Sequence, residues 1–123
     1  MKFNHFTIRT SEPETVRDFF SGVIGLRDGP RPPFDFPGFW MYEGEQAIVH
    51  ILGDKDHNPP PDTGAFDHAA FEGDGNHYDE MIIKLDNSEF AYYTRIVPVV
   101  LRRQVFITGP HGIKIELNYP PAA

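Results

Sequence analysis

The sequence predicts an α+β protein built from two similar halves, and three observations lead to that fold class. Several short segments alternate apolar and polar residues, which is typical of strands. Two other segments, beginning at Val16 and Tyr78, repeat apolar residues at helical spacing. The order strand, helix, strands occurs twice, with a period of about 60 residues. We therefore expect one domain in 123 residues, with modules at about 1–53 and 65–120 joined by a linker at about 54–64.

The first half contains one helix and three strands. Ser11 and Glu14 have the spacing of a capping box, with proline in the first turn, so a helix should begin there. The proline-rich segment that follows this helix is expected to be a loop. The elements expected in this half are a strand at Lys2–Thr10, a helix ending at Gly25, a loop at Arg27–Pro37, and a hairpin of strands Gly38–Tyr42 and Gln46–Leu52.

The second half repeats this order after a connector rich in aspartate, asparagine and proline. Its helix is indicated by Tyr78, Met81, Ile82 and Leu85, which lie on one helical face. A Gly-Pro-His-Gly turn precedes the last strand. The elements expected in this half are a strand at Phe66–Gly73, a helix at Tyr78–Leu85, and strands at Tyr92–Val97, Arg103–Thr108 and Ile113–Tyr119.

The composition argues against several classes of protein. With 40% hydrophobic and 24% charged residues, the chain should fold around a core. The absence of cysteine excludes a disulfide scaffold, a thiolate zinc site and a cysteine nucleophile. A net charge of -7 argues against nucleic acid or an anionic membrane as a partner. No apolar run approaches the roughly 18 residues of a membrane span, and no signal segment follows Met1, so we expect a cytoplasmic protein.

Each half carries one ligand-type residue in its first strand and another in its last strand. Superposing the halves places His5 on His68, and His50 opposite Glu116. Imidazole and carboxylate groups suit divalent metals such as zinc, iron(II), manganese, cobalt and nickel. Glu116 lies in an apolar strand, and a metal ion would offset the cost of burying its charge. Any one of these histidines could be an ordinary half-exposed strand residue, but the repetition favours a metal site.

Four stretches of sequence resemble those of a known superfamily. They are Asn4-His5-Phe6-Thr7, the helix end from Phe19-Phe20 to Gly25-Leu26, Asp67-His68, and the closing Gly109-Pro110-His111-Gly112 with its glutamate strand. They resemble the vicinal oxygen chelate superfamily, which includes glyoxalase I, fosfomycin-resistance proteins, methylmalonyl-CoA epimerase, extradiol dioxygenases and bleomycin-resistance proteins. The resemblance covers almost the whole chain. It departs from the usual pattern at Gly109 and His111, which replace acidic residues of the closing turn.

This resemblance implies a fold, an assembly and a ligand set. The fold would be two paired βαβββ modules forming a cupped mixed sheet with the helices outside, around one divalent ion. Members of this length commonly form homodimers in which modules of both subunits complete each site at the module interface. By the resemblance His5, His68 and Glu116 occupy shared ligand positions. His50 lies where some members have a fourth ligand and others have none.

The resemblance leaves three functions open. A glyoxalase-like lyase or isomerase acting on a small-molecule substrate would use Glu116 as the base. An extradiol-type iron(II) dioxygenase would use His5, His68 and Glu116 as its two-histidine, one-carboxylate triad, with His50 available to deprotonate a catechol. The third function is non-catalytic binding of a small molecule such as an antibiotic, which needs no ligand set. Glutathione-specific and fosfomycin-type activities are disfavoured, because neither the basic thiol-conjugate site nor the potassium-binding loop is found.

The loop Arg27–Pro37 and the residues after it are expected to form a wall of the substrate pocket. Phe34, Phe36 and Trp40 supply apolar area, and Arg31 could clamp a carboxylate. The alternative is a rigid loop that tucks its aromatic rings into the core.

Two residues of the first strand are further candidates for binding substrate. Arg9 shares a strand face with His5 and could meet an anion, although a solvated strand end explains it equally well. Thr7 lies two residues after the first ligand, as a threonine does in the fosfomycin-type transferases. Arg102 and Arg103 are expected to be surface charges.

Overall fold

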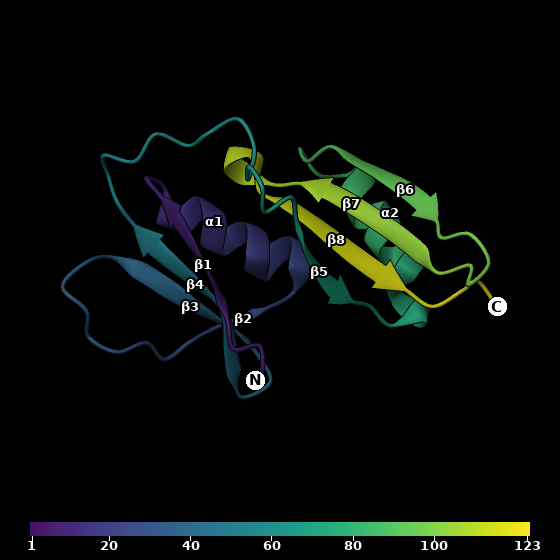
Figure 1. Cartoon of the computed structure of the whole chain (residues 1–123), viewed down its shortest axis with the longest axis horizontal. Helices are drawn as coiled ribbons and strands as arrows, with labels where there is room; N and C mark the ends of the chain where they lie inside the picture. The colour runs from purple at the N-terminus through teal and green to yellow at the C-terminus, as the bar shows by residue number, and fades with distance from the viewer. The chain divides into compact units, whose positions relative to one another are not determined.

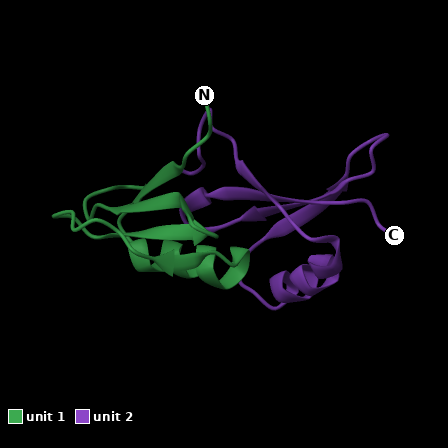
Figure 2. Ribbon diagram, turned by 90° about the horizontal axis from the view of Figure 1, so that it is seen from below, with its two compact units in different colours: residues 1–59 green, residues 60–123 purple.

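The computed structural model describes all 123 residues, which divide into two compact units, Met1–Pro59 and Pro60–Ala123 (Figure 2). Each unit contains one four-stranded mixed sheet and one α-helix in the order βαβββ. The strand orders are β1-β4-β3-β2 and β5-β8-β7-β6, so the two sheets share one topology. This confirms the α+β fold class and the two βαβββ modules expected from the sequence. None of the helices is long and apolar enough to cross a membrane.

In the first unit β1 pairs in parallel with β4, while β4 with β3 and β3 with β2 pair antiparallel (Figure 1). The strand β2 lies inside the segment expected to be a loop. It is a three-residue edge strand, too short for an alternating pattern to reveal. The elements are β1 (Phe6–Thr10), α1 (Pro13–Phe19), a π-helical turn η1 (Phe20–Ile24), β2 (Arg27–Gly29), β3 (Gly38–Glu43) and β4 (Gln46–Gly53).

The second unit repeats this pairing, with β5 parallel to β8 and the other neighbours antiparallel. Figure 1 shows α2 behind this sheet. The Tyr78 ring of this helix packs edge to face on the Tyr119 ring, with 5.2 Å between the ring centroids. The elements are β5 (Ala69–Glu72), η2 (Gly75–His77), α2 (Tyr78–Asp86), β6 (Tyr92–Ile96), β7 (Arg103–Thr108), η3 (Pro110–Gly112) and β8 (Lys114–Tyr119).

The first helix begins differently from the expectation. The capping box at Ser11 is wrong, because the helix starts after Glu12 and no side chain caps it. Instead the Glu12 N–H donates to Thr10 Oγ1 at 2.9 Å, so a residue before the helix turns the chain. Pro13 is the first helical residue, as expected. The helical segment made of α1 and η1 is capped at its C-terminal end by Gly25. The φ of this residue is 91°, in the left-handed region that favours glycine.

Each sheet buries one face against its own helix and leaves the other face open. In unit 1 the side chains of Met41, Val49 and Ile51 are buried on the face that α1 covers. Their neighbours Trp40 and His50 point to the opposite face, because successive strand residues alternate. Burial of each such apolar side chain contributes about 1.5–3 kcal/mol. Alternation therefore separates the core of each unit from the face that carries the predicted site residues.

Both first strands begin later than the sequence pattern indicates. β1 starts at Phe6 and β5 at Ala69, so His5 and His68 stand just before their strands. At the first strand a side chain replaces the ladder, because Gln46 Nε2 donates to the Asn4 carbonyl at 2.6 Å. The two histidines keep the face they would have in a longer strand.

Candidate functional site

The two open sheet faces carry the predicted ligands at equivalent positions. In unit 1, His50 of β4 lies between Thr7 of β1 and Trp40 of β3. In unit 2, Glu116 of β8 lies between Ala70 of β5 and Phe106 of β7. His5 comes two residues before Thr7, the β1 partner of His50. His68 comes two residues before Ala70, the β5 partner of Glu116. The internal repeat therefore places a pair of ligand-type side chains on the open face of each unit.

In unit 2 the pair is in direct contact. His68 Nε2 lies 3.0 Å from Glu116 Oε1, and the other ring nitrogen, Nδ1, lies 2.8 Å from Asp67 Oδ2. The His68 side chain is 30% exposed and that of Glu116 is 8% exposed. With Nδ1 directed at Asp67, Nε2 and the carboxylate oxygen face each other, and the two atoms can share a cation. The contact is therefore a place for a positive charge.

Two amides hold the second oxygen of Glu116. Gln104 Nε2 donates to Oε2 at 3.2 Å, and Asn118 Nδ2 donates to the same oxygen at 3.1 Å. Both donors are fixed on strands that flank or contain Glu116. The Gln104 Oε1 atom is buried without a hydrogen-bond partner. In this orientation the Gln104 amide leaves its oxygen unsatisfied but donates through its nitrogen to a buried carboxylate. A hydrogen bond to a charged group contributes more free energy than one between neutral groups.

Asp67 links His68 to a lysine. Lys114 Nζ lies 3.3 Å from Asp67 Oδ2, the same oxygen that accepts from His68. The hydrogen bond from His68, followed by that from Lys114, lowers the pKa of Asp67. The bond to Asp67 raises the pKa of Lys114. Asp67 is thus kept ionised as the acceptor that orients the His68 ring.

In unit 1 the two histidines form part of a three-ring stack. The His5 and His50 ring centroids are 3.7 Å apart with an interplanar angle of 15°, and the Trp40 and His50 centroids are 4.0 Å apart at 11°. His5 Nδ1 donates to Asn4 Oδ1 at 2.6 Å, as His68 does to Asp67. Burial, followed by the neighbouring His5, lowers the pKa of His50. The ring of His50 is therefore favoured in its neutral form, which is the form that ligates metals.

The chemistry of these donors fits a divalent ion. In unit 2 the 3.0 Å between Nε2 and Oε1 equals the separation expected of adjacent ligands at roughly 2.1 Å from one ion. In unit 1 Asn4 likewise leaves Nε2 of His5 free. A metal ion lies in the plane of an imidazole that binds it, and two nearly parallel, stacked rings cannot both have the same ion in their planes. His5 and His50 can therefore share an ion only if one ring turns. Nowhere in the structure do three or more histidine, aspartate or glutamate side chains gather closely enough to hold a metal ion.

The proline-rich loop folds onto its own arginine. Arg31 Nη2 donates to the Phe36 carbonyl at 2.8 Å, and its guanidinium lies 5.0 Å from the rings of both Phe34 and Phe36. Phe34 is 46% exposed and stacks on Phe36 at 5.1 Å. Trp40 is in contact with this group, with 6.4 Å between its ring and that of Phe34. The loop thus carries an aromatic and cationic cluster beside His50.

Thr7 and Arg9 lie on the open face of unit 1, in register with His50 and Leu52. Both are exposed. Their parts in binding a substrate stay predictions, as do those of the loop residues.

Three further polar residues of unit 2 were missed from the sequence. Gln104 and Asn118 hold Glu116, and Arg102, expected to be a surface charge, donates through Nε to Asn118 Oδ1. Asn118 could have been found, because it follows Glu116 by two residues and so shares its strand face. Gln104 and Arg102 depend on the register of β7 with β8, which a single sequence does not reveal.

The sequence matches no family model and no curated protein, but the structure is similar to many solved ones. A glyoxalase/dioxygenase from Nostoc punctiforme is 20% identical over 98% of this chain and 92% of its own, with a TM-score of 0.80. A genomically encoded fosfomycin resistance protein from Listeria monocytogenes is 14% identical over 97% and 93%, with a TM-score of 0.72. Lactoylglutathione lyase from Agrobacterium tumefaciens is 17% identical over 96% and 92%, with a TM-score of 0.66.

These comparisons confirm the fold that the resemblance implied. The chain has the fold of the vicinal oxygen chelate superfamily over nearly its full length. At such low identities the likeness concerns the fold, and function has to be argued from the residues themselves.

Proposed function

We propose that this protein is a metal-dependent, glyoxalase-like lyase or isomerase that acts on a small oxygenated substrate. The observation that carries the proposal is the His68–Glu116 contact, with Asp67 on the far nitrogen of the imidazole. A carboxylate behind a histidine is the usual support of a metal ligand. Asn4 and His5 repeat the arrangement in unit 1 with an amide oxygen.

The proposed ligand set is His5, His50, His68 and Glu116. As the resemblance to the superfamily implies, we propose that these donors bind one ion in a homodimer. Nitrogen and oxygen donors suit zinc, iron(II), manganese, nickel or cobalt. Light scattering at micromolar concentration checks the homodimer, which a monomeric mass would contradict.

Glu116 is the proposed base. A divalent ion held by these residues would polarise a carbonyl and so make the neighbouring proton easier for Glu116 to remove. Oε2 of Glu116 already accepts from Gln104 and Asn118, so Oε1 is the atom that would take the proton, once it is released from the ion. The two amides, one on β7 and one on β8, fix the plane of the carboxylate and leave Oε1 facing His68. Phe106, edge to face with His68 at 5.4 Å, excludes water from one side of the pair.

The functions of the structural neighbours support enzyme chemistry on a small molecule. They include a lactoylglutathione lyase, a glyoxalase/dioxygenase and a fosfomycin resistance protein. A non-catalytic binder would have no need of the His68–Glu116 pair, so we place the enzyme first.

Proton exchange tests this proposal. The protein is stripped on a chelating resin, reloaded with each candidate ion, and incubated in D₂O with hydroxyketones and hemithioacetals. We expect deuterium at the carbon beside the carbonyl with the native protein and none with Glu116→Gln. The exposed Glu80→Gln variant on α2 is the matched control and should exchange normally. Equal exchange by Glu116→Gln would contradict the role of Glu116.

The parallel stack of His50 supports a second candidate function. If His50 stays between Trp40 and His5, the remaining donors are His5, His68 and Glu116, the triad of iron(II) oxygenases. The protein would then be an extradiol-type dioxygenase. Oxygen consumption with catechols by the iron(II)-loaded protein would favour this function over the lyase. Its absence, with deuterium exchange present, would exclude it.

A further inference from the structure

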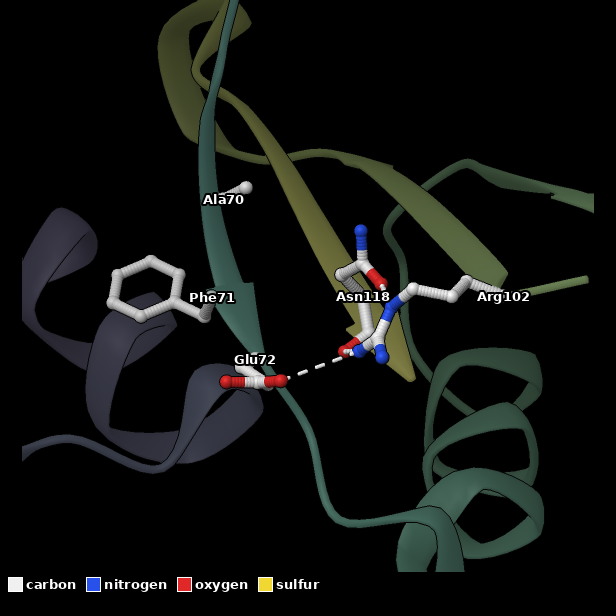
Figure 3. Close-up of a pocket in the computed structure, with 5 residues that line it drawn as sticks. All are labelled: Ala70, Phe71, Glu72, Arg102 and Asn118. Atoms are coloured by element: carbon white, nitrogen blue, oxygen red, sulfur yellow. Dashed lines mark hydrogen bonds and ion pairs between the residues drawn. The ribbon is translucent and has the colours of Figure 1, made fainter. Parts of the chain in front are cut away.

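A hollow of about 260 Å³ opens on the sheet face of unit 2. Asn118 lies between this hollow and Glu116. The hollow is lined by Ala70, Phe71, Glu72, Arg102 and Asn118 (Figure 3). The Phe71 side chain points away from β8, so Ala70 and the strand backbone form that side of the hollow. Arg102 reaches over Asn118 toward Glu72, and no other cationic side chain lines the space.

The guanidinium of Arg102 is held on one side and free on the other. Nε donates to Asn118 Oδ1, and Nη2 lies 3.4 Å from the Asn118 carbonyl oxygen. Nη1 makes no hydrogen bond within unit 2, and the side chain is 33% exposed. A fixed guanidinium with an open edge is suited to planar recognition of a carboxylate, because little side-chain freedom remains to be lost on binding.

Glu72 occupies the remaining position on this guanidinium. Its Oε1 lies 3.3 Å from Arg102 Nη2, which is a long contact for an ion pair, and its side chain is 81% exposed. Ion pairs this exposed contribute little free energy. A carboxylate from solution could take the place of Glu72 on Nη2 and gain the free N–H groups of Nη1. The Glu72 carboxylate thus marks where a ligand carboxylate would lie.

We propose that the Arg102 hollow binds the carboxylate of a small organic acid. One guanidinium beside a glutamate favours a singly charged planar anion over a doubly charged one. Along a strand, residues two apart are separated by roughly 7 Å, so an acid held at Arg102 extends toward Glu116 over a few carbon atoms. This last step rests on the proposed function and makes the substrate a short oxo or hydroxy acid.

Nuclear magnetic resonance of the full chain tests the binding directly. The ¹⁵N-labelled protein is stripped on a chelating resin, so that no metal and no soluble carboxylate chelator remains, and is titrated with propionate. We expect saturable shifts of the Arg102 Nε–H and the Asn118 side-chain amide. Arg102→Gln should weaken propionate binding at least about tenfold, and Arg102→Lys nearly as much, since lysine keeps the charge but loses the planar fork.

Of two further variants, we expect one to bind propionate more tightly and the other to leave binding unchanged. Glu72→Gln should bind propionate a few-fold more tightly, because it removes the competing carboxylate. Arg103→Gln removes the same charge one residue away, from a side chain that lies 4.2 Å from the Tyr78 ring and donates to the Pro120 carbonyl. It should bind propionate like the native protein. Unchanged binding in Arg102→Gln, or weaker binding in Glu72→Gln, would overturn the proposal.

A comparison of propionate with inorganic phosphate tests whether the site prefers a carboxylate. Tighter binding of inorganic phosphate than of propionate would overturn the assignment to carboxylates. Because the titration uses metal-free protein, its outcome does not depend on metal binding or on exchange at Glu116. Propionate binding without exchange activity would sink the proposed reaction and leave the anion site standing, and the converse result would sink this site alone.

Discussion

The Nε2 atom of His68 lies 3.0 Å from the Oε1 atom of Glu116, across the parallel pairing of β5 with β8. Forty-eight residues separate the two in sequence, yet each is oriented by its own partners, Asp67 for the histidine and two amides for the glutamate. Such support on both sides fixes the position of the two atoms that we propose as ligands.

Gln104→Met should weaken binding of a divalent ion by about tenfold, since residues behind a ligand typically contribute 10–100-fold. The variant removes one donor from Glu116 Oε2 but also removes the buried, unpartnered Oε1. Its free energy of unfolding should therefore change by less than about 1 kcal/mol. Calorimetric titration and urea denaturation measure the two effects. A large loss of stability with unchanged metal affinity would show that Gln104 serves only the fold.

Trp40 should report on the histidine stack. It is the single tryptophan, and its ring lies 4.0 Å from that of His50. If zinc binds through both His5 and His50, the parallel stack must open and the Trp40 fluorescence must change. His50→Ala should abolish this response. Zinc binding in the native protein without any change in emission would place His50 outside the ligand set.

Gly38→Ala should destabilise the first unit by several kcal/mol. A Cβ at this position would lie 2.2 Å from the Ile51 carbonyl oxygen in β4, which is backbone and cannot move aside cheaply. Gly22→Ala is the matched control, because nothing lies within 4 Å of a Cβ there. In a helical turn that variant should be neutral or slightly stabilising. Thermal unfolding of both variants distinguishes close packing from a general intolerance of alanine.

Tyr119 should make the fold sensitive to alkali. Burial, with a smaller effect of Tyr78, raises the pKa of Tyr119, so the folded protein favours the neutral phenol. The unfolded chain ionises near pH 10, so this stabilisation is complete below about pH 10 and declines as the pH rises above it. Tyr119→Phe should flatten the fall of the urea midpoint between about pH 9.5 and 11. An identical pH profile in both proteins would contradict the assignment.

Sequence periodicity was sufficient for the two helices, for every strand except β2, and for the equivalence of the two halves. The repeat made His5 equivalent to His68 and His50 equivalent to Glu116, and the structure places His5 with His50 in unit 1 and His68 with Glu116 in unit 2. Alternation along β4 and β8 explains this success, because a strand with one buried face has only one acceptable register.

The features that the sequence did not reveal arise from contacts between strands or between side chains and backbone. Thr10 Oγ1 accepts the Glu12 N–H, which displaces the capping box expected at Ser11. Arg102 reaches Asn118 only because the β6–β7 hairpin brings it beside β8. The ring stack of His50 likewise depends on Trp40 from the neighbouring strand. The contacts of Arg102 and of His50 have no local signature, because each depends on residues that only the fold brings together.

Calorimetric titration of the stripped protein with nickel(II) or manganese(II) tests the central claim most directly. We expect one ion for each chain, with affinity reduced at least about 100-fold in both His68→Ala and Glu116→Gln. His77→Ala, which removes an exposed histidine of η2, should bind like the native protein. If no ion binds, or if the two site variants bind it as tightly as the His77 control, the His68–Glu116 pair is not a metal site.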